Sequence, residues 1–200
     1  MRLRVFRLAF RADQFRMQSI FSFLNAKMKH SETVFDRQAI AGRVAALGRQ
    51  IKADYQGQQL VLIGVLNGAF IFLADLARAI DMELEIDFIR VASYGGATAS
   101  SGSVVLRKEP ELDLAGKHVL LVEDIVDSGL TAAWLRNYFL ATHQAASVKI
   151  CALIDKQERR AVDAQLDYAG FQISSGFLVG CGLDCAQKYR NLPDIRAVKA

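Results

Sequence analysis

Proline, cysteine and long apolar runs are all scarce in this 200-residue chain. With 2 prolines and no low-complexity segment, nothing indicates a flexible linker or a disordered tail. The 3 cysteines, Cys151, Cys181 and Cys185, are odd in number and show no CxxC spacing, which argues against a disulfide framework or a zinc site and favours a reducing compartment. The longest apolar runs, such as residues 60–66, are far shorter than the roughly 20 residues needed to cross a bilayer. We therefore expect a cytoplasmic protein without a membrane span.

The charge looks basic, at +4 with a pI near 9.0, but the excess lies at one end of the chain. Residues 1–27 hold six basic residues and one acid, a net of +5, so residues 28–200 carry −1. A near-neutral body lacks the clustered Lys and Arg that would neutralise the phosphates of a nucleic acid. We therefore expect no nucleic-acid partner.

Residues 1–27 are rich in Arg and aromatic residues and poor in acids, which is compatible with an organelle transit peptide. An extra surface helix would also fit, as would a mis-called start with Met17 or Met28 as the true first residue. We favour the mis-called start, because every segment with an interpretable pattern follows Met28. The chain then divides into a basic N-terminal extension, residues 1–27, and one domain, residues 28–200, whose length suits a single core.

Apolar periodicity predicts alternating strands and helices. Helical spacing over residues 31–55, with Ser31 or Asp36 available as a cap, predicts a first helix. Further predicted helices are 69–80 and 129–143, and predicted strands are 60–66, 83–93, 103–107, 117–124 and 147–155, with short strands within 171–184. This order indicates an α/β fold with a mostly parallel sheet flanked by helices. Ligands of such folds bind beyond the carboxyl ends of the strands.

The stretch VLLVEDIVDSGLTAAWL, residues 119–135, places three acids at such a position: Glu123, Asp124 and Asp127. Ser128, Gly129 and Thr131 follow and offer hydroxyls and backbone N–H groups at a helix N-terminus, which favours an anion such as a phosphate. The alternative is that the acids are solvated strand ends and Ser128 is only a helix cap. Taken together, the spacing favours a sugar-phosphate site, with carboxylates for hydroxyls or a metal.

These residues resemble the type I phosphoribosyltransferases, and specifically the hypoxanthine-guanine phosphoribosyltransferases, from about Ser31 to Ile195. The resemblance implies the type I phosphoribosyltransferase fold, with a small hood built from N- and C-terminal segments. It also implies a purine salvage glycosyltransferase that converts hypoxanthine or guanine and phosphoribosyl pyrophosphate to IMP or GMP and pyrophosphate. The family's matches to Glu123 and Asp124 bind the ribose hydroxyls. Its loop matching Asp127, Ser128, Gly129, Leu130 and Thr131 wraps the 5-phosphate, and the match to Asp127 accepts the proton of purine N7.

Two further segments resemble family loops. Leu66, Asn67 and Gly68 look like the pyrophosphate loop, in which a non-proline cis peptide turns backbone N–H groups towards the diphosphate. The family often has Lys where this chain has Asn67, and we expect the backbone to do much of the binding there. Ser93, Tyr94 and Gly95 resemble the start of a flexible lid that excludes water from the reacting ribose. The alternative for residues 94–103 is a mobile surface loop.

The resemblance extends to the purine end of the site. The match to Lys156 hydrogen-bonds the purine 6-oxo group, and a lysine, which only donates, would select a carbonyl over the amino group of adenine. The match to Phe177 stacks on the base, and the Leu178 and Asp184 region contacts its edge. Arg190 would reach the pyrophosphate, and Glu123, Asp124 and Asp184 would hold Mg2+.

Several alternatives stay open. Taken singly, Lys156 could be a surface lysine and Phe177 a core residue. Cys181 and Cys185 stand where the family commonly has Tyr, and we interpret them as packing changes. The preference among hypoxanthine, guanine and xanthine is not resolved, and a homodimer or homotetramer rests on the resemblance. The competing functions are a regulator of the same fold that binds nucleic acid and a same-fold transferase for another base.

Overall fold

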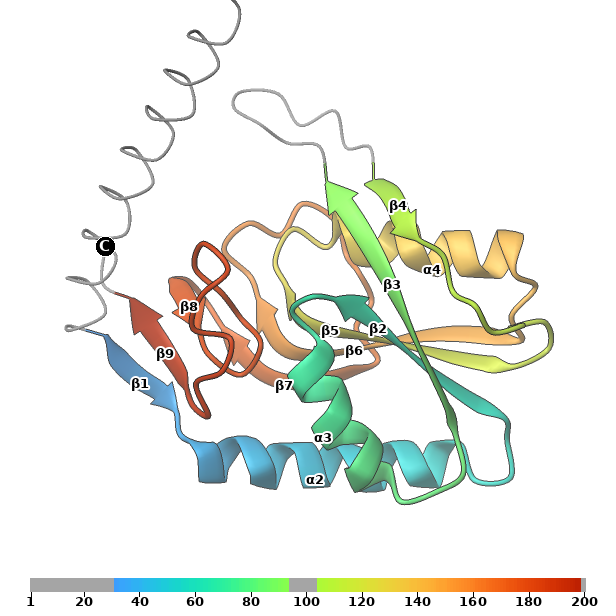
Figure 1. Ribbon diagram of the computed structural model, residues 1–200, viewed down its shortest axis with the longest axis horizontal. Helices are drawn as coiled ribbons and strands as arrows, with labels where there is room; N and C mark the ends of the chain where they lie inside the picture. The colour runs from blue at the N-terminus through green and yellow to red at the C-terminus, as the bar shows by residue number, and fades with distance from the viewer. Residues whose placement is uncertain (1–30, 94–103, 199–200) are drawn as a thin grey trace, which may run out of the picture.

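The computed structural model describes residues 31–93 and 104–198, which form two sheets and three helices (Figure 1). The elements are β1 (Glu32–Phe35), α2 (Arg37–Asp54), β2 (Leu60–Leu66), α3 (Phe70–Ile80), β3 (Glu85–Ser93), β4 (Val104–Lys108), β5 (His118–Val126), α4 (Leu130–Thr142), β6 (Ser147–Lys156), β7 (Tyr168–Ile173), β8 (Phe177–Val179) and β9 (Ile195–Val198). The larger sheet has the order β4-β3-β2-β5-β6-β7, and the smaller has the order β1-β9-β8.

The larger sheet is parallel except at one edge, where β4 runs antiparallel to β3. The smaller sheet joins a strand from the N-terminal part of the domain to two strands from its C-terminal part (Figure 1). The predicted fold class, a mostly parallel sheet flanked by helices with a hood of N- and C-terminal segments, is therefore confirmed.

Each central strand packs against a hydrophobic core on both faces of the sheet, which explains why its sequence is apolar without interruption. Leu60 and Leu62 pack on the face covered by α2 and α3, whereas Val61 and Ile63 pack on the face covered by α4. Figure 1 shows α2 and α3 together on one side of the sheet and α4 on the other. Burial on both faces is the reason for the continuous run over residues 60–66.

The predicted first helix was wrong at its start. Residues 32–35 form β1, which pairs antiparallel with β9, and α2 begins only at Arg37. Asp36 is the N-cap, and its Oδ1 accepts the backbone N–H of Ala39 at 2.7 Å. The partner strand β9 lies about 160 residues away along the chain, so local periodicity could not indicate the pairing.

The strand β5 does not finish at its two acids, as the sequence predicted. It continues through Ile125 and Val126, which pair with Ile154 and Asp155 of β6. Glu123 and Asp124 therefore stand inside a paired strand rather than after it. This position holds their backbone rigidly.

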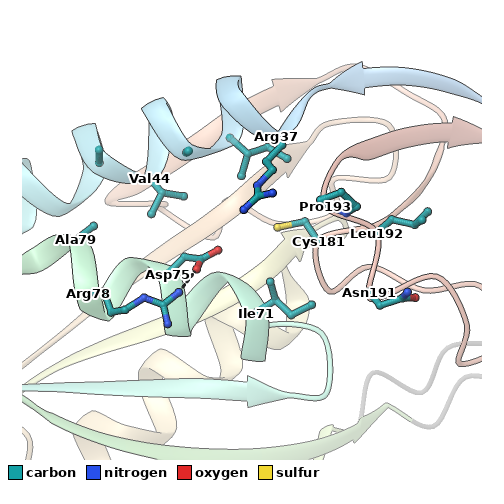
Figure 2. A pocket seen from close by; sticks show the side chains of 13 residues that line it. Arg37, Val44, Ile71, Asp75, Arg78, Ala79, Cys181, Asn191, Leu192 and Pro193 are labelled. Carbon is teal, nitrogen blue, oxygen red and sulfur yellow. Dashed lines mark hydrogen bonds and ion pairs between the residues drawn. The ribbon is translucent and has the colours of Figure 1, made fainter.

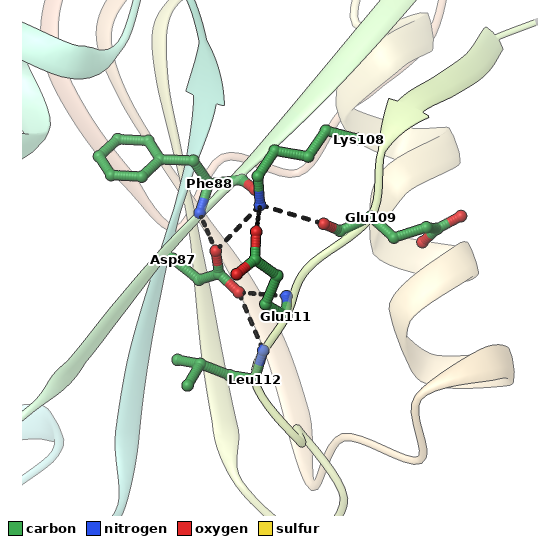
Figure 3. A network of polar contacts seen from close by, with 6 residues as sticks. All are labelled: Asp87, Phe88, Lys108, Glu109, Glu111 and Leu112. Atoms are coloured by element: carbon green, nitrogen blue, oxygen red, sulfur yellow. Dashed lines mark hydrogen bonds and ion pairs between the residues drawn. The ribbon is translucent and has the colours of Figure 1, made fainter.

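The edge strand β4 is anchored to β3 by the buried carboxylate of Asp87 (Figure 3). This carboxylate accepts the backbone N–H groups of Phe88, Glu111 and Leu112 at 2.6, 2.5 and 3.0 Å, and Lys108 Nζ lies 3.4 Å away. Burial alone would raise the pKa of Asp87, but the three N–H donors and Lys108 outweigh it and hold the pKa below its usual value. The network fixes the end of the β3–β4 pair at which β4 finishes.

Candidate active site

Most of the predicted ligand-binding residues lie at the carboxyl ends of β2, β5 and β6, where a parallel α/β sheet places its site. The loop after β2 touches β5 directly. A Cβ atom added to Gly68 would lie 1.9 Å from Asp124 Oδ2, so only glycine fits against this carboxylate. The segment after β8 packs on the same loop, because a Cβ atom on Gly182 would lie 2.1 Å from the Gly68 carbonyl oxygen. Three segments distant in sequence thus meet around Asp124.

The peptide bond between Leu66 and Asn67 is cis, as the resemblance implied. The strand β2 ends at Leu66, and α3 begins at Phe70, so the three residues 67–69 make the whole connection. Asn67 and Gly68 therefore lie beside the acids of β5.

Glu123 and Asp124 stand in a poorly solvated place. Glu123 is buried, and burial together with the neighbouring Asp124 raises its pKa well above the usual value. Burial raises the pKa of Asp124 to about 6, and Asp184 adds to the rise, while backbone N–H groups and Arg190 oppose it. The alternative that the acids are solvated strand ends is wrong for Glu123, whereas Asp124 is half-buried by accessible surface. A ligand that brings hydroxyl donors or positive charge would stabilise the ionised form of these carboxylates.

The loop after β5 leads into α4 with Gly129 at φ +81°, a left-handed conformation that glycine adopts without strain. Next to this loop lies a cavity of about 150 Å3, lined by Glu123, Ile125, Val126, Asp127, Ser128, Gly129, Thr131 and Ala132. Ser128 Oγ accepts the N–H of Leu130 at a long distance, 3.4 Å. The N-terminal N–H groups of α4 point to this end, so the cavity suits an anion.

Asp127 and Lys156 approach one another across the ends of β5 and β6. Lys156 Nζ lies 3.8 Å from Asp127 Oδ2 and 3.0 Å from Glu158 Oε2, and only 8% of the Lys156 side chain is exposed. Asp127 Oδ1 is buried and has no hydrogen-bond partner within residues 31–93 and 104–198. Lys156 is therefore no surface lysine, and Asp127 Oδ1 is an acceptor that the described residues leave unsatisfied.

Phe177 is 51% exposed at the start of β8, so the alternative that it belongs to the core is wrong. Leu178, next to it, is buried. The rest of the segment holds Arg190, whose guanidinium lies 2.8 Å from Asp184 Oδ1 and donates to the Gly182 carbonyl at 2.7 Å. The other Asp184 oxygen accepts the N–H of Gln187 at 2.8 Å. Arg190 thereby fixes this segment beside the Gly68 loop.

The three predicted magnesium ligands are not assembled as a set. Among the described residues, no group of three or more His, Cys, Asp or Glu side chains could hold a metal. Asp184 is close enough to Asp124 to affect its pKa, but it is paired with Arg190. Glu123 and Asp124 offer the carboxylate oxygens that Mg2+ prefers, so they fit the ion, with the remaining ligands left to substrate and water.

A second cavity, of about 650 Å3, lies between α2, α3 and residues 181–193 (Figure 2). Figure 2 shows Cys181 facing this cavity, with Arg37, Asp75 and Arg78 around it. No residue that we predicted to bind a ligand lines it. Cys181 is buried, Cys185 is half-buried, and both are free thiols, as is Cys151.

Sequence reasoning missed Arg160, in the loop after β6. Its side chain donates to backbone carbonyl groups of Asp127, Val126 and Lys156 and pairs with the buried carboxylate of Asp155. The only signal was its position a few residues after Lys156, in a polar loop without periodicity. Such a pattern does not distinguish a buried arginine from an exposed one.

Part of the prediction concerns residues outside the described ranges. These are two residues of the predicted lid, Tyr94 and Gly95, and the predicted extension, residues 1–27. The third lid residue, Ser93, is the last residue of β3. Of the helices within the described ranges, none combines the length and the apolar character needed to cross a membrane.

Comparisons with known proteins show the family to which the chain belongs. Residues 30–186 match the model of the phosphoribosyl transferase domain, so the chain belongs to the phosphoribosyl transferase family. Among named relatives, the hypoxanthine-guanine phosphoribosyltransferase of Streptococcus pneumoniae is 46% identical over 153 residues, covering 76% of this chain and 84% of the relative. The hypoxanthine phosphoribosyltransferase of Salmonella typhimurium is 42% identical over 174 residues, covering 86% and 97%.

Solved structures show the same fold. The hypoxanthine phosphoribosyltransferase of Staphylococcus aureus superposes with a TM-score of 0.80 at 39% identity, covering 84% of this chain and 91% of that one. A hypoxanthine-guanine phosphoribosyltransferase of Bacillus anthracis gives 0.78 at 45% identity, covering 84% and 98%. The resemblance stated from the sequence is thus confirmed at the level of family and fold.

Proposed function

We propose that the chain transfers the phosphoribosyl group of phosphoribosyl pyrophosphate to hypoxanthine or guanine, and so forms IMP or GMP and pyrophosphate in purine salvage. The observation that carries this proposal is the pair of Asp127 and Lys156. Asp127 Oδ2 lies 3.8 Å from the buried ammonium of Lys156, Asp127 Oδ1 has no hydrogen-bond partner among the described residues, and Asp127 lines the anion cavity at α4. A 6-oxopurine has the complementary groups, a ring N–H and a carbonyl.

The ribose phosphate would occupy the cavity at the N-terminus of α4. Ser128, Gly129, Leu130 and Thr131 would surround the 5-phosphate with N–H groups and hydroxyls, and the helix dipole would favour its charge. The neighbouring Glu123 and Asp124 would accept the two ribose hydroxyls. Their raised pKa values support this role, because carboxylates with few partners of their own gain most from such donors.

The leaving diphosphate would lie near Leu66, Asn67 and Gly68, with Arg190 close by. The C1–oxygen bond breaks, its electron pair leaves with the pyrophosphate, and the purine N9 lone pair forms the new bond to C1. Asp127 takes the proton that N7 loses. Backbone N–H groups and the Arg190 guanidinium would stabilise the charge that develops on the diphosphate.

The purine would lie between Phe177 and the ends of β5 and β6. The exposed ring of Phe177 offers a stacking face, and Lys156 would donate to the 6-oxo group. Leu178 and the Asp184 region would contact the edge of the base. Adenine, with an amino group in place of the carbonyl, would present a donor to the Lys156 ammonium, which also only donates, and would bind poorly.

Mg2+ would be held by Glu123 and Asp124, with Asp184 nearby, and when bound it would neutralise charge on the diphosphate. We further propose a homodimer or homotetramer in the cytoplasm, with Ser93, Tyr94 and Gly95 starting a lid and residues 1–27 forming a basic N-terminal extension. A regulator that binds nucleic acid is disfavoured, because residues 28–200 carry a net charge near zero.

A panel of bases tests the proposal and its main alternative. Purified protein, Mg2+ and phosphoribosyl pyrophosphate are mixed separately with hypoxanthine, guanine, xanthine and adenine, and nucleotides are separated by chromatography. IMP or GMP, with little AMP, is expected. XMP alone would assign the chain to another base, and the absence of every nucleotide would exclude the enzyme.

A further inference from the structure

The loop between β6 and β7 carries an arginine that bonds to both halves of the candidate purine site. Arg160 Nε donates to the carbonyl oxygen of Asp127 at 3.0 Å. Its Nη2 group lies 3.2 Å from the carbonyl oxygens of both Val126 and Lys156. Only 18% of the side chain is exposed, and its charge is balanced by Asp155, which is 8% exposed. One guanidinium therefore binds the last residue of β5, the residue after it and the last residue of β6.

These contacts span two neighbouring strands at the same level. Val126 of β5 pairs with Asp155 of β6 in the parallel register, so Asp127 and Lys156 stand side by side just beyond that pair. Arg160 donates to the backbone carbonyl of Asp127 and to that of Lys156. These are the two residues that carry the carboxylate and the ammonium of the purine site. The guanidinium thus links the backbones of these two residues.

The residues after Arg160 brace the phosphate loop. The N–H groups of Ala161 and Val162 both donate to the Ser128 carbonyl, at 2.9 and 3.2 Å. A Cβ atom on Gly129 would lie 2.6 Å from the Val162 carbonyl oxygen and 3.3 Å from Arg160 Cδ. Residues 160–162 and 127–129 therefore fit together without spare room, and the shape of one loop is set by the other.

We infer that Arg160, held by Asp155, is a positioning residue for phosphoribosyl transfer, which fixes the distance between the Asp127 carboxylate and the Lys156 ammonium through their backbone carbonyls. This inference rests on the proposed function of those two groups. Lysine cannot replace the arginine, because a single ammonium does not reproduce the planar set of donors that reaches carbonyls on two strands and a carboxylate together.

Arg136 provides a matched control. Its side chain is 16% exposed, pairs with Asp167 at 2.6 Å and donates to the Gln165 carbonyl at 2.7 Å. It joins α4 to the loop before β7, at the opposite ends of the strands from Asp127 and Lys156. Loss of its contacts should lower stability without changing the purine site.

The experiment compares Arg160→Lys, Arg160→Ala and Arg136→Lys with the wild-type chain. Thermal unfolding gives the stability of each, and steady-state assays with Mg2+, hypoxanthine and phosphoribosyl pyrophosphate give kcat and the KM for each substrate. For Arg160→Lys we expect kcat/KM for hypoxanthine to fall about a hundredfold, with a raised purine KM, since a misplacement near 1 Å costs on that order. For Arg136→Lys we expect both KM values within about twofold of wild type.

KM separates positioning from simple loss of folded protein, because a smaller folded fraction lowers kcat and leaves KM unchanged. Added guanidinium ion should restore part of the activity that Arg160→Ala loses. It should not restore any activity that Arg136→Lys loses. An unchanged purine KM in Arg160→Lys, at equal folded fraction, overturns the inference. If the wild-type chain forms no nucleotide, the proposed function itself fails, and this outcome is visible before any variant is compared.

Discussion

Replacing Gly68 by alanine tests how tightly the pyrophosphate loop and the acids of β5 are coupled. The nearest atom to an added Cβ is Asp124 Oδ2, at 1.9 Å, followed by Asp124 Cγ at 2.3 Å. Carbon and oxygen atoms without a bond need about 3 Å, so Asp124 or the loop must move by about 1 Å. Because Asp124 Cγ and Oδ1 also lie within 3 Å of the added Cβ, the whole carboxylate and not one oxygen alone must shift.

The size of the effect follows from that shift. Extra volume in a packed region costs about 1–3 kcal/mol of stability. A displacement near 1 Å at a binding group costs on the order of a hundredfold in rate. We therefore expect Gly68→Ala to lower kcat/KM for phosphoribosyl pyrophosphate about a hundredfold while the protein stays folded at 25 °C.

The assay measures kcat/KM for phosphoribosyl pyrophosphate at saturating hypoxanthine, together with thermal unfolding. Gly42→Ala is the control, because a Cβ atom there meets nothing within 4 Å and alanine favours the helix by about 0.5–1 kcal/mol. The control should match wild type in activity and be slightly more stable. Wild-type kinetics in Gly68→Ala would refute the coupling between the loop and Asp124.

Four further predictions concern acids and the buried lysine. Asp127→Asn should lower kcat by about a hundredfold or more with little change in substrate affinity, and an unchanged kcat would remove its role as base. Lys156→Ala should raise the KM for oxopurines and leave that for phosphoribosyl pyrophosphate unchanged, whereas equal losses would indicate a structural role. Since the pKa of Asp124 is about 6, kcat/KM for phosphoribosyl pyrophosphate should fall as the pH drops below that value and the carboxylate is protonated, and a flat profile from pH 7 to 5 would contradict this. Asp87→Asn should cost about 2 kcal/mol at pH 7 in urea unfolding. The folded-state pKa of Asp87 lies below the unfolded value, so the stabilisation by its carboxylate is complete above the unfolded pKa and is lost as the pH falls through the folded pKa. An equal loss of unfolding free energy in Asp87→Asn at pH 7 and pH 3 would contradict this.

The sequence predicted the parts of the fold whose signals are local. The run over residues 60–66 gave β2 with the correct bounds, because a strand buried on both faces has no polar residue to blur its ends. The motif around Asp124 and Gly129 was informative because strand, turn and helix follow one another within a few residues. Family resemblance then supplied roles that spacing alone does not give.

What the sequence could not predict depends on distant contacts. The strand β1 looked like the start of a helix because its partner, β9, lies at the far end of the domain. Arg160 was missed because its four acceptors come from two strands and become neighbours only in the parallel register. The burial of Lys156 likewise follows from the packing of the loops and not from its neighbours in sequence.

The most direct measurement is the stoichiometry of one reaction. The wild-type chain is incubated with Mg2+, hypoxanthine and phosphoribosyl pyrophosphate, and IMP, pyrophosphate and ribose 5-phosphate are each quantified. The account predicts that IMP and pyrophosphate appear in equal amounts, with little ribose 5-phosphate. Pyrophosphate released with ribose 5-phosphate and no IMP, or no consumption of either substrate, would contradict transfer to a purine.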